Sequence, residues 1–221
     1  MGSLVQTGKL VVALWLAVAV STPVLAGAPE DFTSASKTYA SGDVVGSMPL
    51  LRRSADAGYA PAQVLLAEIL DRSEFDEEAV GYYRKAADQG NADGQFGLGS
   101  MISIGEGVKK DLAAARRWIT LAAEQGHKQA IGVMAQAFIG GQLGISEPER
   151  QGEEARRWIR KAADIGYLPA IDALLLAYRN GGIGLEADAA EADRWQAKAN
   201  ELRGIRLTSG KGKGRKQEVK K

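Results

Sequence analysis

The sequence contains no cysteine and only one histidine among its 221 residues. The lack of cysteine excludes disulfides, thiolate metal sites, cysteine nucleophiles and a lipid-modified N-terminal cysteine. Catalytic triads and zinc pairs need a histidine with further partners, but His127 stands alone, and we interpret it as a surface residue of an inter-repeat loop. No Gly-x-Ser-x-Gly elbow or phosphate-binding loop is present. We therefore expect no catalysis, no metal and no cofactor.

The chain also lacks a strong net charge, which is +1 overall. This balance hides an asymmetry, because residues 203–221 carry a net charge of +7 and residues 10–202 carry −7. We expect the basic segment to be a disordered tail. It could contact an anionic glycan, a lipid head group, an acidic partner or the acidic body, or serve only solubility. Nucleic acid is not expected, since no aromatic is interleaved for base stacking.

Only one long apolar run occurs, from Leu10 to Val20. It follows Lys9 and precedes small residues that suit cleavage before Gly27, so residues 1–26 are predicted to be a signal peptide. Eleven helical residues span only about 16 Å, against about 30 Å for a membrane core. We expect a periplasmic or secreted protein, with an uncleaved inner-membrane anchor extending to Ala26 as the alternative.

A five-residue segment recurs along the chain and ends each time in glycine. The copies are SADAG, AADQG, AAEQG and AADIG, at residues 54–58, 86–90, 122–126 and 162–166. Eight positions before each glycine stands a large residue: Leu50, Tyr82, Trp118 or Trp158. Trp195 occupies the same position in a last copy, so this slot holds every tryptophan outside the N-terminal apolar run. Such self-similarity predicts a solenoid of stacked repeats.

Each repeat is predicted to contain two helices, A and B. Helix A begins near Ala62, Gly94, Ala130 or Ala170. Helix B carries the large residue and ends at the glycine, which suits the left-handed position after a helix. The expected fold is all-α: an α/α solenoid of about four to five stacked helix pairs, over residues 27–202.

The connections between helices A and B differ among the repeats. Glycine-rich turns are expected at residues 105–108 and 181–184. A longer polar turn spans residues 140–151, where Pro148 and Glu149 suit the start of the next helix. In the degenerate first unit, residues 31–57, we expect Pro49 to interrupt helix B. The carboxylates at residues 76–78 and 153–154 are assigned to the starts of B helices, where they complement the helix dipole.

Three features together resemble the Sel-one-like repeat family, a relative of the tetratricopeptide repeats. They are the Ala-Ala-Glu-Gln-Gly segment, the Gly-Glu-Gly-Val turn with Asp111 after it, and the helix-B tryptophan. The resemblance covers residues 28–202 and is strongest over residues 89–126. It implies a right-handed superhelix used for protein–protein contacts. Many exported members act as adaptors or regulators of envelope processes, including exopolysaccharide production.

Stacked A helices line the concave face of such a solenoid, so their exposed ridges are the candidate binding surface. One ridge (i, i+4, i+7) mixes polar and apolar side chains, which suits a groove for a partner's peptide or helix. It comprises Val64, Glu68, Asp71, Phe96, Ser100, Ser103, Gly132, Gln136, Ile139, Asp172, Leu176 and Arg179. The neighbouring ridge has no polar side chain and is assigned to the core: Leu65, Ile69, Gly97, Met101, Val133, Ala137, Ala173 and Ala177. The alternative is that the first ridge is merely a solvated face.

The sequence thus predicts an exported interaction scaffold or regulator. Phe96→Ala should weaken partner capture with little change in melting temperature, whereas Trp118→Ala should cost about 3–5 kcal/mol, as truncation of a buried aromatic does. Two other functions stay open. One is an envelope hydrolase acting on a glycan or penicillin-type substrate, against which the lack of a nucleophile–base pair counts. The other is an anchored structural subunit of an export machine.

Overall fold

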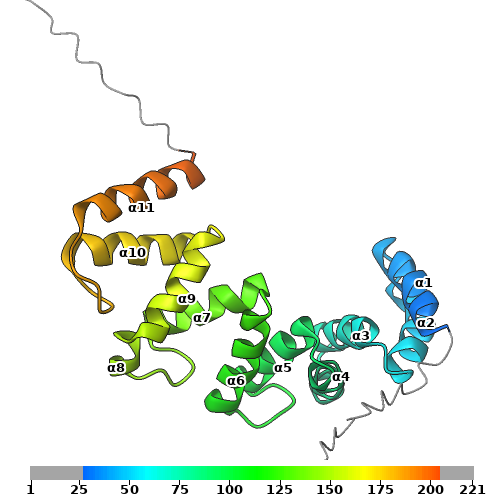
Figure 1. Cartoon of the computed structure of the whole chain (residues 1–221). Coiled ribbons are helices and arrows are strands. Elements are labelled where there is room, and N and C mark those ends of the chain that lie inside the picture. The colour runs from blue at the N-terminus through cyan, green and yellow to red at the C-terminus, as the bar shows by residue number, and fades with distance from the viewer. Residues whose placement is uncertain (1–26, 205–221) are drawn as a thin grey trace, which may run out of the picture.

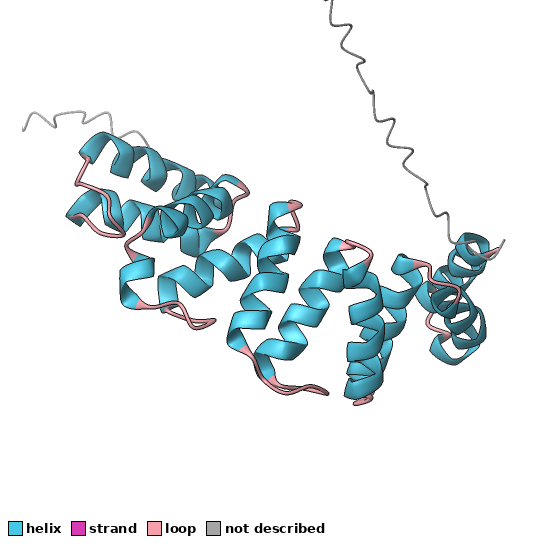
Figure 2. Ribbon diagram, turned by 60° about the horizontal axis from the view of Figure 1, so that its bottom comes forward, coloured by secondary structure: helices cyan, strands magenta, loops and turns pink. Residues whose placement is uncertain are grey.

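The computed structural model describes residues 27–204, and the helices follow an arc (Figure 1). The predicted signal peptide and residues 205–221 of the basic tail lie outside the described residues. Apart from an isolated β-bridge between Gly182 and Leu185, the described part consists of helices joined by loops (Figure 2). Within residues 27–204, no helix has the length and apolar content that a membrane span requires.

Five helix pairs account for the described residues, which confirms the predicted all-α solenoid. The A helices are α1 (Ala28–Ala40), α3 (Ala60–Arg72), α5 (Ala92–Ile104), α7 (Lys128–Gly140) and α10 (Leu168–Asn180). The B helices are α2 (Val44–Asp56), α4 (Asp76–Asp88), α6 (Leu112–Glu124), α9 (Glu153–Asp164) and α11 (Ala189–Leu202). A short extra helix, α8 (Glu147–Arg150), precedes α9. In Figure 1, α4 and α6 lie on the lower, outer side of the arc, with α3 and α5 above them.

The repeat-closing glycines all adopt the left-handed backbone conformation that was predicted. Their φ angles are +90° at Gly58, +81° at Gly90, +88° at Gly126 and +87° at Gly166. At Gly90 the glycine N–H donates to the carbonyl of Ala87 at 2.9 Å, which satisfies a helix-end carbonyl. Because a side chain at such φ values is strained, the glycine allows each B helix to turn directly into the next A helix.

Two features near prolines differ from expectation. Helix α2 continues through Pro49 rather than breaking there. The hydrogen bond that proline cannot make would go to the carbonyl of Val45, a residue 83% exposed, and buried Leu51 anchors the helix beyond it. Pro148 and Glu149 lie in the first turn of the separate helix α8, which begins at Glu147, and not in helix B, because extended Gly152 (ψ 174°) divides α8 from α9.

Helix α8 is held by the carboxylate of Glu149. Its Oε2 accepts from the backbone N of Ser146 at 2.8 Å and from the Ser146 hydroxyl at 2.6 Å. The Arg116 guanidinium donates to Oε1 at 2.9 Å. These hydrogen bonds lower the pKa of Glu149 to about 2, with those from Ser146 contributing most. The polar turn between α7 and α9 is therefore tied to α6.

The core divides into two clusters within α6. Ala115 belongs to the cluster of α1–α5, whereas Ile119 and Ala122 belong to the cluster that extends to α11.

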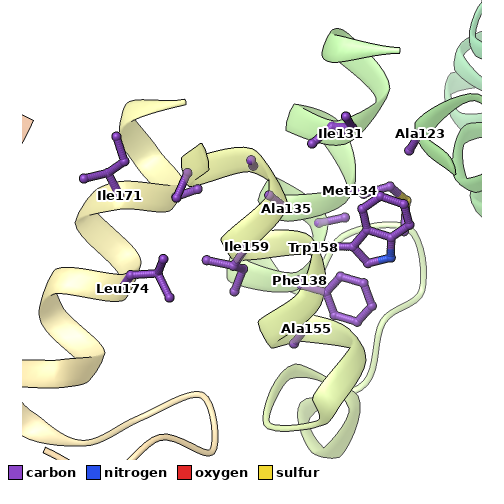
Figure 3. Close-up of a cluster of buried hydrophobic side chains, with 14 of the residues drawn as sticks. Ala123, Ile131, Met134, Ala135, Phe138, Ala155, Trp158, Ile159, Ile171 and Leu174 are labelled. Atoms are coloured by element: carbon purple, nitrogen blue, oxygen red, sulfur yellow. The ribbon is translucent and has the colours of Figure 1, made fainter. Parts of the chain in front are cut away.

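The large residue of helix B, eight positions before the repeat-closing glycine, is not buried equally in all repeats. It is buried at Tyr82, Trp158 and Trp195, but Leu50 and Trp118 are only half-buried. In α2 and α6 the adjacent residues, Leu51 and Ile119, occupy the core instead. The expected full burial of Trp118 was therefore wrong. The fully buried Trp158 lies beside Met134 and Phe138 (Figure 3).

Candidate peptide-binding groove

Three hollows follow one another along the A helices α3, α5, α7 and α10. The first, which we call the acidic hollow, has a volume of about 260 Å³. It is lined by Glu68, Asp71, Tyr83, Asp93, Phe96, Gly97, Ser100, Met101, Ile104, Glu106, His127 and Gln129. Four of these residues are carboxylates, and among the described residues that line it there is neither Lys nor Arg. The Arg72 guanidinium, which is not part of this lining, lies 3.8 Å from the Glu68 carboxylate.

Burial sets the electrostatics of the acidic hollow. Desolvation raises the pKa of Glu68, and the neighbouring carboxylates of Asp93 and Asp71 raise it further against the opposing effect of Arg72. The pKa of Asp71 is also raised, mainly by burial and then by Asp76. The pKa of Tyr83 rises because of burial and because Glu68 and Asp71 are close. The negative charges here are thus only partly balanced, and a cation entering the hollow would be stabilised.

The second hollow, which we call the apolar hollow, has a volume of about 620 Å³. Its lining residues are Phe96, Lys128, Gln129, Gly132, Val133, Gln136, Gln142, Ile165, Gly166 and Tyr167. Phe96 lines both this hollow and the acidic one, so the two are contiguous. Space opens at Gly132 because its nearest neighbour in the described chain, the Tyr167 ring, would lie 3.8 Å from an added Cβ. The hollow could receive an apolar side chain of a ligand.

The third hollow, which we call the C-terminal hollow, has a volume of about 330 Å³ and lies along α7 and α10. It is lined by Phe138, Ile139, Arg150, Gln151, Pro169, Asp172, Ala173, Leu176, Ala177, Gly181, Gly182 and Ile183. Leu176 is 60% exposed although it is a large apolar residue. Ile104 in the acidic hollow and Ile165 in the apolar hollow are also exposed. Exposed apolar side chains thus occur in all three hollows, which together form what we call the groove.

The predicted partner-binding residues fall mostly on this groove. Phe96, Gln136, Ile139, Asp172, Leu176, Glu68, Asp71 and Ser100 line one or more hollows. Three others do not. Val64 is buried in the core, the Ser103 hydroxyl donates to the Ser100 carbonyl at 2.8 Å, and exposed Arg179 donates to Gln196 at 3.0 Å. Gly132 also lines the apolar hollow.

The ridge that was assigned to the core is only partly buried. Ile69, Met101, Ala137 and Ala177 lie in the core, as expected. Leu65, Gly97, Val133 and Ala173 are half-buried, and the last three line hollows of the groove. The assignment was therefore wrong for the first member of each pair. At Gly97 and Ala173 the small residue leaves space that forms part of a hollow.

His127 is not the surface loop residue that was expected. Its side chain, only 12% exposed, caps α7 by accepting from the backbone N of Ala130 on Nδ1 at 3.1 Å. Its Nε2 lies 3.2 Å from Oδ1 of Asp93. The ring stacks on Phe96, with centroids 4.7 Å apart and 29° between the ring planes. His127 therefore connects α5 to α7 at the boundary between the acidic and apolar hollows.

Replacing His127 by alanine is expected to lower the free energy of unfolding by about 1–2 kcal/mol, because it removes the helix cap and the aromatic stack. His127→Asn is the matched control, since Asn91 occupies the same repeat position and accepts from the backbone N of Gly94 at 2.8 Å. The asparagine variant should lose less than half as much. Urea denaturation followed by circular dichroism measures both, and equal losses would mean that the cap contributes nothing.

The outer face contrasts with the groove in charge. Its two hollows are lined by arginines and lysine of α6 and α9: Arg116, Arg117, Arg156, Arg157, Arg160 and Lys161. Several of these cations already have partners. Arg116 binds Glu149, and Arg157 binds Glu124 at 2.8 Å. Within residues 27–204, no group of three or more His, Asp or Glu is arranged to hold a metal ion.

Comparison with known proteins identifies the repeats. Residues 76–91, 92–127 and 133–167 match the model of the Sel1 repeat, the repeat described above as Sel-one-like. Among solved structures, the chain is similar to a protective antigen present in uropathogenic Escherichia coli strains and displaying an SLR fold. The sequence identity is 32% and the TM-score 0.69, over 79% of this chain and 38% of the antigen. The chain thus spans well under half of the antigen's length.

A Sel1 repeat protein from Oxalobacter formigenes is similar too, with 28% identity and a TM-score of 0.67 over 76% of this chain and 69% of that protein. No curated protein matches the chain. The three matched repeats extend from α4 to the end of α9, and the structural similarity reaches beyond them. The chain is thus a Sel1 repeat protein, and its stacked helix pairs form the SLR fold.

Proposed function

We propose that this protein is an exported scaffold or regulator of envelope processes, exopolysaccharide production among them, and that it binds a peptide or helix of a partner protein in the groove. It acts by binding and not by catalysis. The observation that carries this proposal is the series of three hollows along the A helices, each of which exposes a large apolar side chain. Exposed apolar surface rimmed by polar groups is typical of partner-binding sites.

Export is supported by the apolar run at Leu10–Val20 and by the small residues before Gly27. N-terminal sequencing of the protein isolated from the envelope tests it. We expect the mature chain to begin at Gly27. A chain that still begins at Lys9 or earlier would contradict cleavage and favour the membrane-anchored alternative.

Leu176 and Leu121 offer a matched pair for testing the groove. Leu176 lines the C-terminal hollow, whereas Leu121, 48% exposed, lies on the outer face of α6. Leu176→Ala is expected to weaken binding of the partner roughly 10-fold or more, as loss of an interface anchor does. Leu121→Ala should leave binding unchanged, and both variants should keep the wild-type melting temperature.

The measurement is affinity capture from the envelope fraction, identification of the partner by mass spectrometry, and titration of the purified partner against each variant. Phe96→Ala is a second groove variant, for which we now expect a modest loss of stability because Phe96 stacks on His127. Equal affinity of the Leu176 and Leu121 variants for the partner would contradict the proposed function.

A further inference from the structure

The described chain ends at the rim of the groove. Leu202, the last residue of α11, lies beside Gly166, because a Cβ added to Gly166 would be 3.8 Å from Cδ1 of Leu202. Gly166 lines the apolar hollow. The next residue, Arg203, donates to both carboxylate oxygens of Asp172, at 2.7 and 2.6 Å. Asp172 lines the C-terminal hollow. Residues 205–221 therefore begin directly after residues that contact the linings of the apolar and C-terminal hollows.

Beyond that point, apolar residues precede cationic residues along the sequence. Ile205 and Leu207 come first, and they are the only large apolar residues before Val219. A cluster of cations follows at Lys211, Lys213, Arg215, Lys216, Lys220 and Lys221. Glu218 is the only acid in the segment.

The groove presents the complementary order when it is followed from α11 towards the N-terminus. The apolar hollow with Ile165, Tyr167 and Val133 lies beside Leu202 through Gly166, and Phe96 connects it to the acidic hollow. The acidic hollow is lined by the carboxylates of Glu68, Asp71, Asp93 and Glu106. Among the described residues that line it there is no Lys or Arg. Cationic side chains on the outer face would repel the same segment.

The length of the segment matches this path. Packed helices lie about 8–10 Å apart. At about 10 Å for each step, the path from α10 past α7 and α5 to α3 is roughly 30 Å long. An extended chain advances about 3.3 Å per residue. Lys211 to Lys216 can therefore reach about 23–40 Å from Gly204, which covers the acidic hollow.

We propose that residues 205–221 of this chain fold back into the groove of the same molecule, with Ile205 and Leu207 at the apolar hollow and the lysine–arginine cluster at the acidic hollow. The inference rests on the groove being the binding surface of the proposed function. A segment tethered to the rim competes at an effective concentration on the order of mM. The tail is thus an internal competitor, and a partner binds only by displacing it.

The lack of cysteine makes the test direct. A single Gln217→Cys variant of the chain with its C-terminus intact carries a nitroxide spin label, and nuclear magnetic resonance reports which backbone amides lose signal near the label. We expect signals of α3 and α5 residues that line the acidic hollow to lose at least half of their intensity. Signals from the outer helix α9, which packs on α7 and α10, should be unchanged. Raising NaCl from about 0.1 M to about 1 M shortens the screening length from about 10 Å to about 3 Å and should restore the signals.

Charge reversal supplies the matched control. Asp93→Lys in the acidic hollow should abolish the signal loss, whereas Glu77→Lys on the exposed first turn of α4, outside the hollow, should preserve it. Spectra recorded after reduction of the label establish that each variant is folded. Uniform signal loss, or loss that survives Asp93→Lys, would overturn the proposal.

Mixing spin-labelled chains with isotope-labelled, unmodified chains separates two arrangements. Signal loss in that mixture would mean that the tail enters the groove of a second copy, which contradicts the intramolecular proposal. If the tail stays out of the groove while Leu176→Ala still weakens partner binding, this inference fails and the proposed function stands. If Leu176→Ala leaves partner binding intact, the proposed function fails independently.

Discussion

Trp158→Ala is expected to lower the free energy of unfolding by about 3–5 kcal/mol, because truncating a fully buried aromatic loses its transfer free energy and leaves a cavity. The indole lies against Met134 and Phe138 of the preceding A helix (Figure 3). Arg157 and Lys161 also lie over the ring, 4.6 and 4.9 Å from its centroid. Truncation therefore weakens the contact between α7 and α9. Urea denaturation followed by circular dichroism measures the loss.

Trp118→Ala is the matched control, because Trp118 occupies the same repeat position but is half-buried. Its replacement removes less apolar area from the core, so we expect a loss of about 1–2 kcal/mol. The difference between the two variants measures how α6 and α9 are rotated about their axes. Equal losses would show that the tryptophans are buried alike, contrary to the structure.

Gly94→Ala is expected to lower the free energy of unfolding by about 1–3 kcal/mol, although alanine favours helices over glycine. A Cβ on Gly94 would lie 2.6 Å from Cβ of Ala86 and 2.9 Å from the backbone N of Ala87. These distances are too short for van der Waals contact, and Ala86 and Ala87 have no flexible side chain to move aside. The substitution would therefore push α5 away from α4.

Gly81→Ala in α4 is the control for the intrinsic helix propensity of alanine relative to glycine. No atom among the described residues lies within 4 Å of a Cβ built there, apart from the helix's own neighbouring backbone. The alanine should raise the free energy of unfolding by about 1 kcal/mol, the usual advantage of alanine over glycine within a helix. If both variants are stabilised in thermal unfolding, the close approach of α4 and α5 at Gly94 does not exist.

The helix pairs were predictable because their signals are local. A glycine such as Gly126 adopts a backbone conformation that depends on its own lack of a side chain, and the structure gives it φ +88°. The choice between Trp118 and Ile119 as the core residue was not predictable. The two side chains point about 100° apart around α6, so a modest rotation of the helix decides which of them enters the core. That rotation depends on packing against α5 and α7, which a repeat pattern does not encode.

The groove was predictable only in part. Counting along the A helices selected Phe96, Gln136 and Leu176 as binding residues, and the structure places the first two in the apolar hollow and the third in the C-terminal hollow. It missed Tyr167 and His127, which stand directly after a repeat-closing glycine and before the counted helix positions. A signal was available, because large or polar side chains follow all four glycines. Whether these side chains point into the groove depends on the angle at which successive helices cross, which the sequence pattern does not give.

Site-specific photocrosslinking in the envelope of living cells tests most directly whether the groove binds the partner. A photoreactive side chain is placed at position 176 in the groove or at position 121 on the outer face of α6. We predict that position 176 gives a crosslink to one partner and that position 121 gives none to it. The same crosslink from position 121, with none from position 176, would contradict a binding role for the groove.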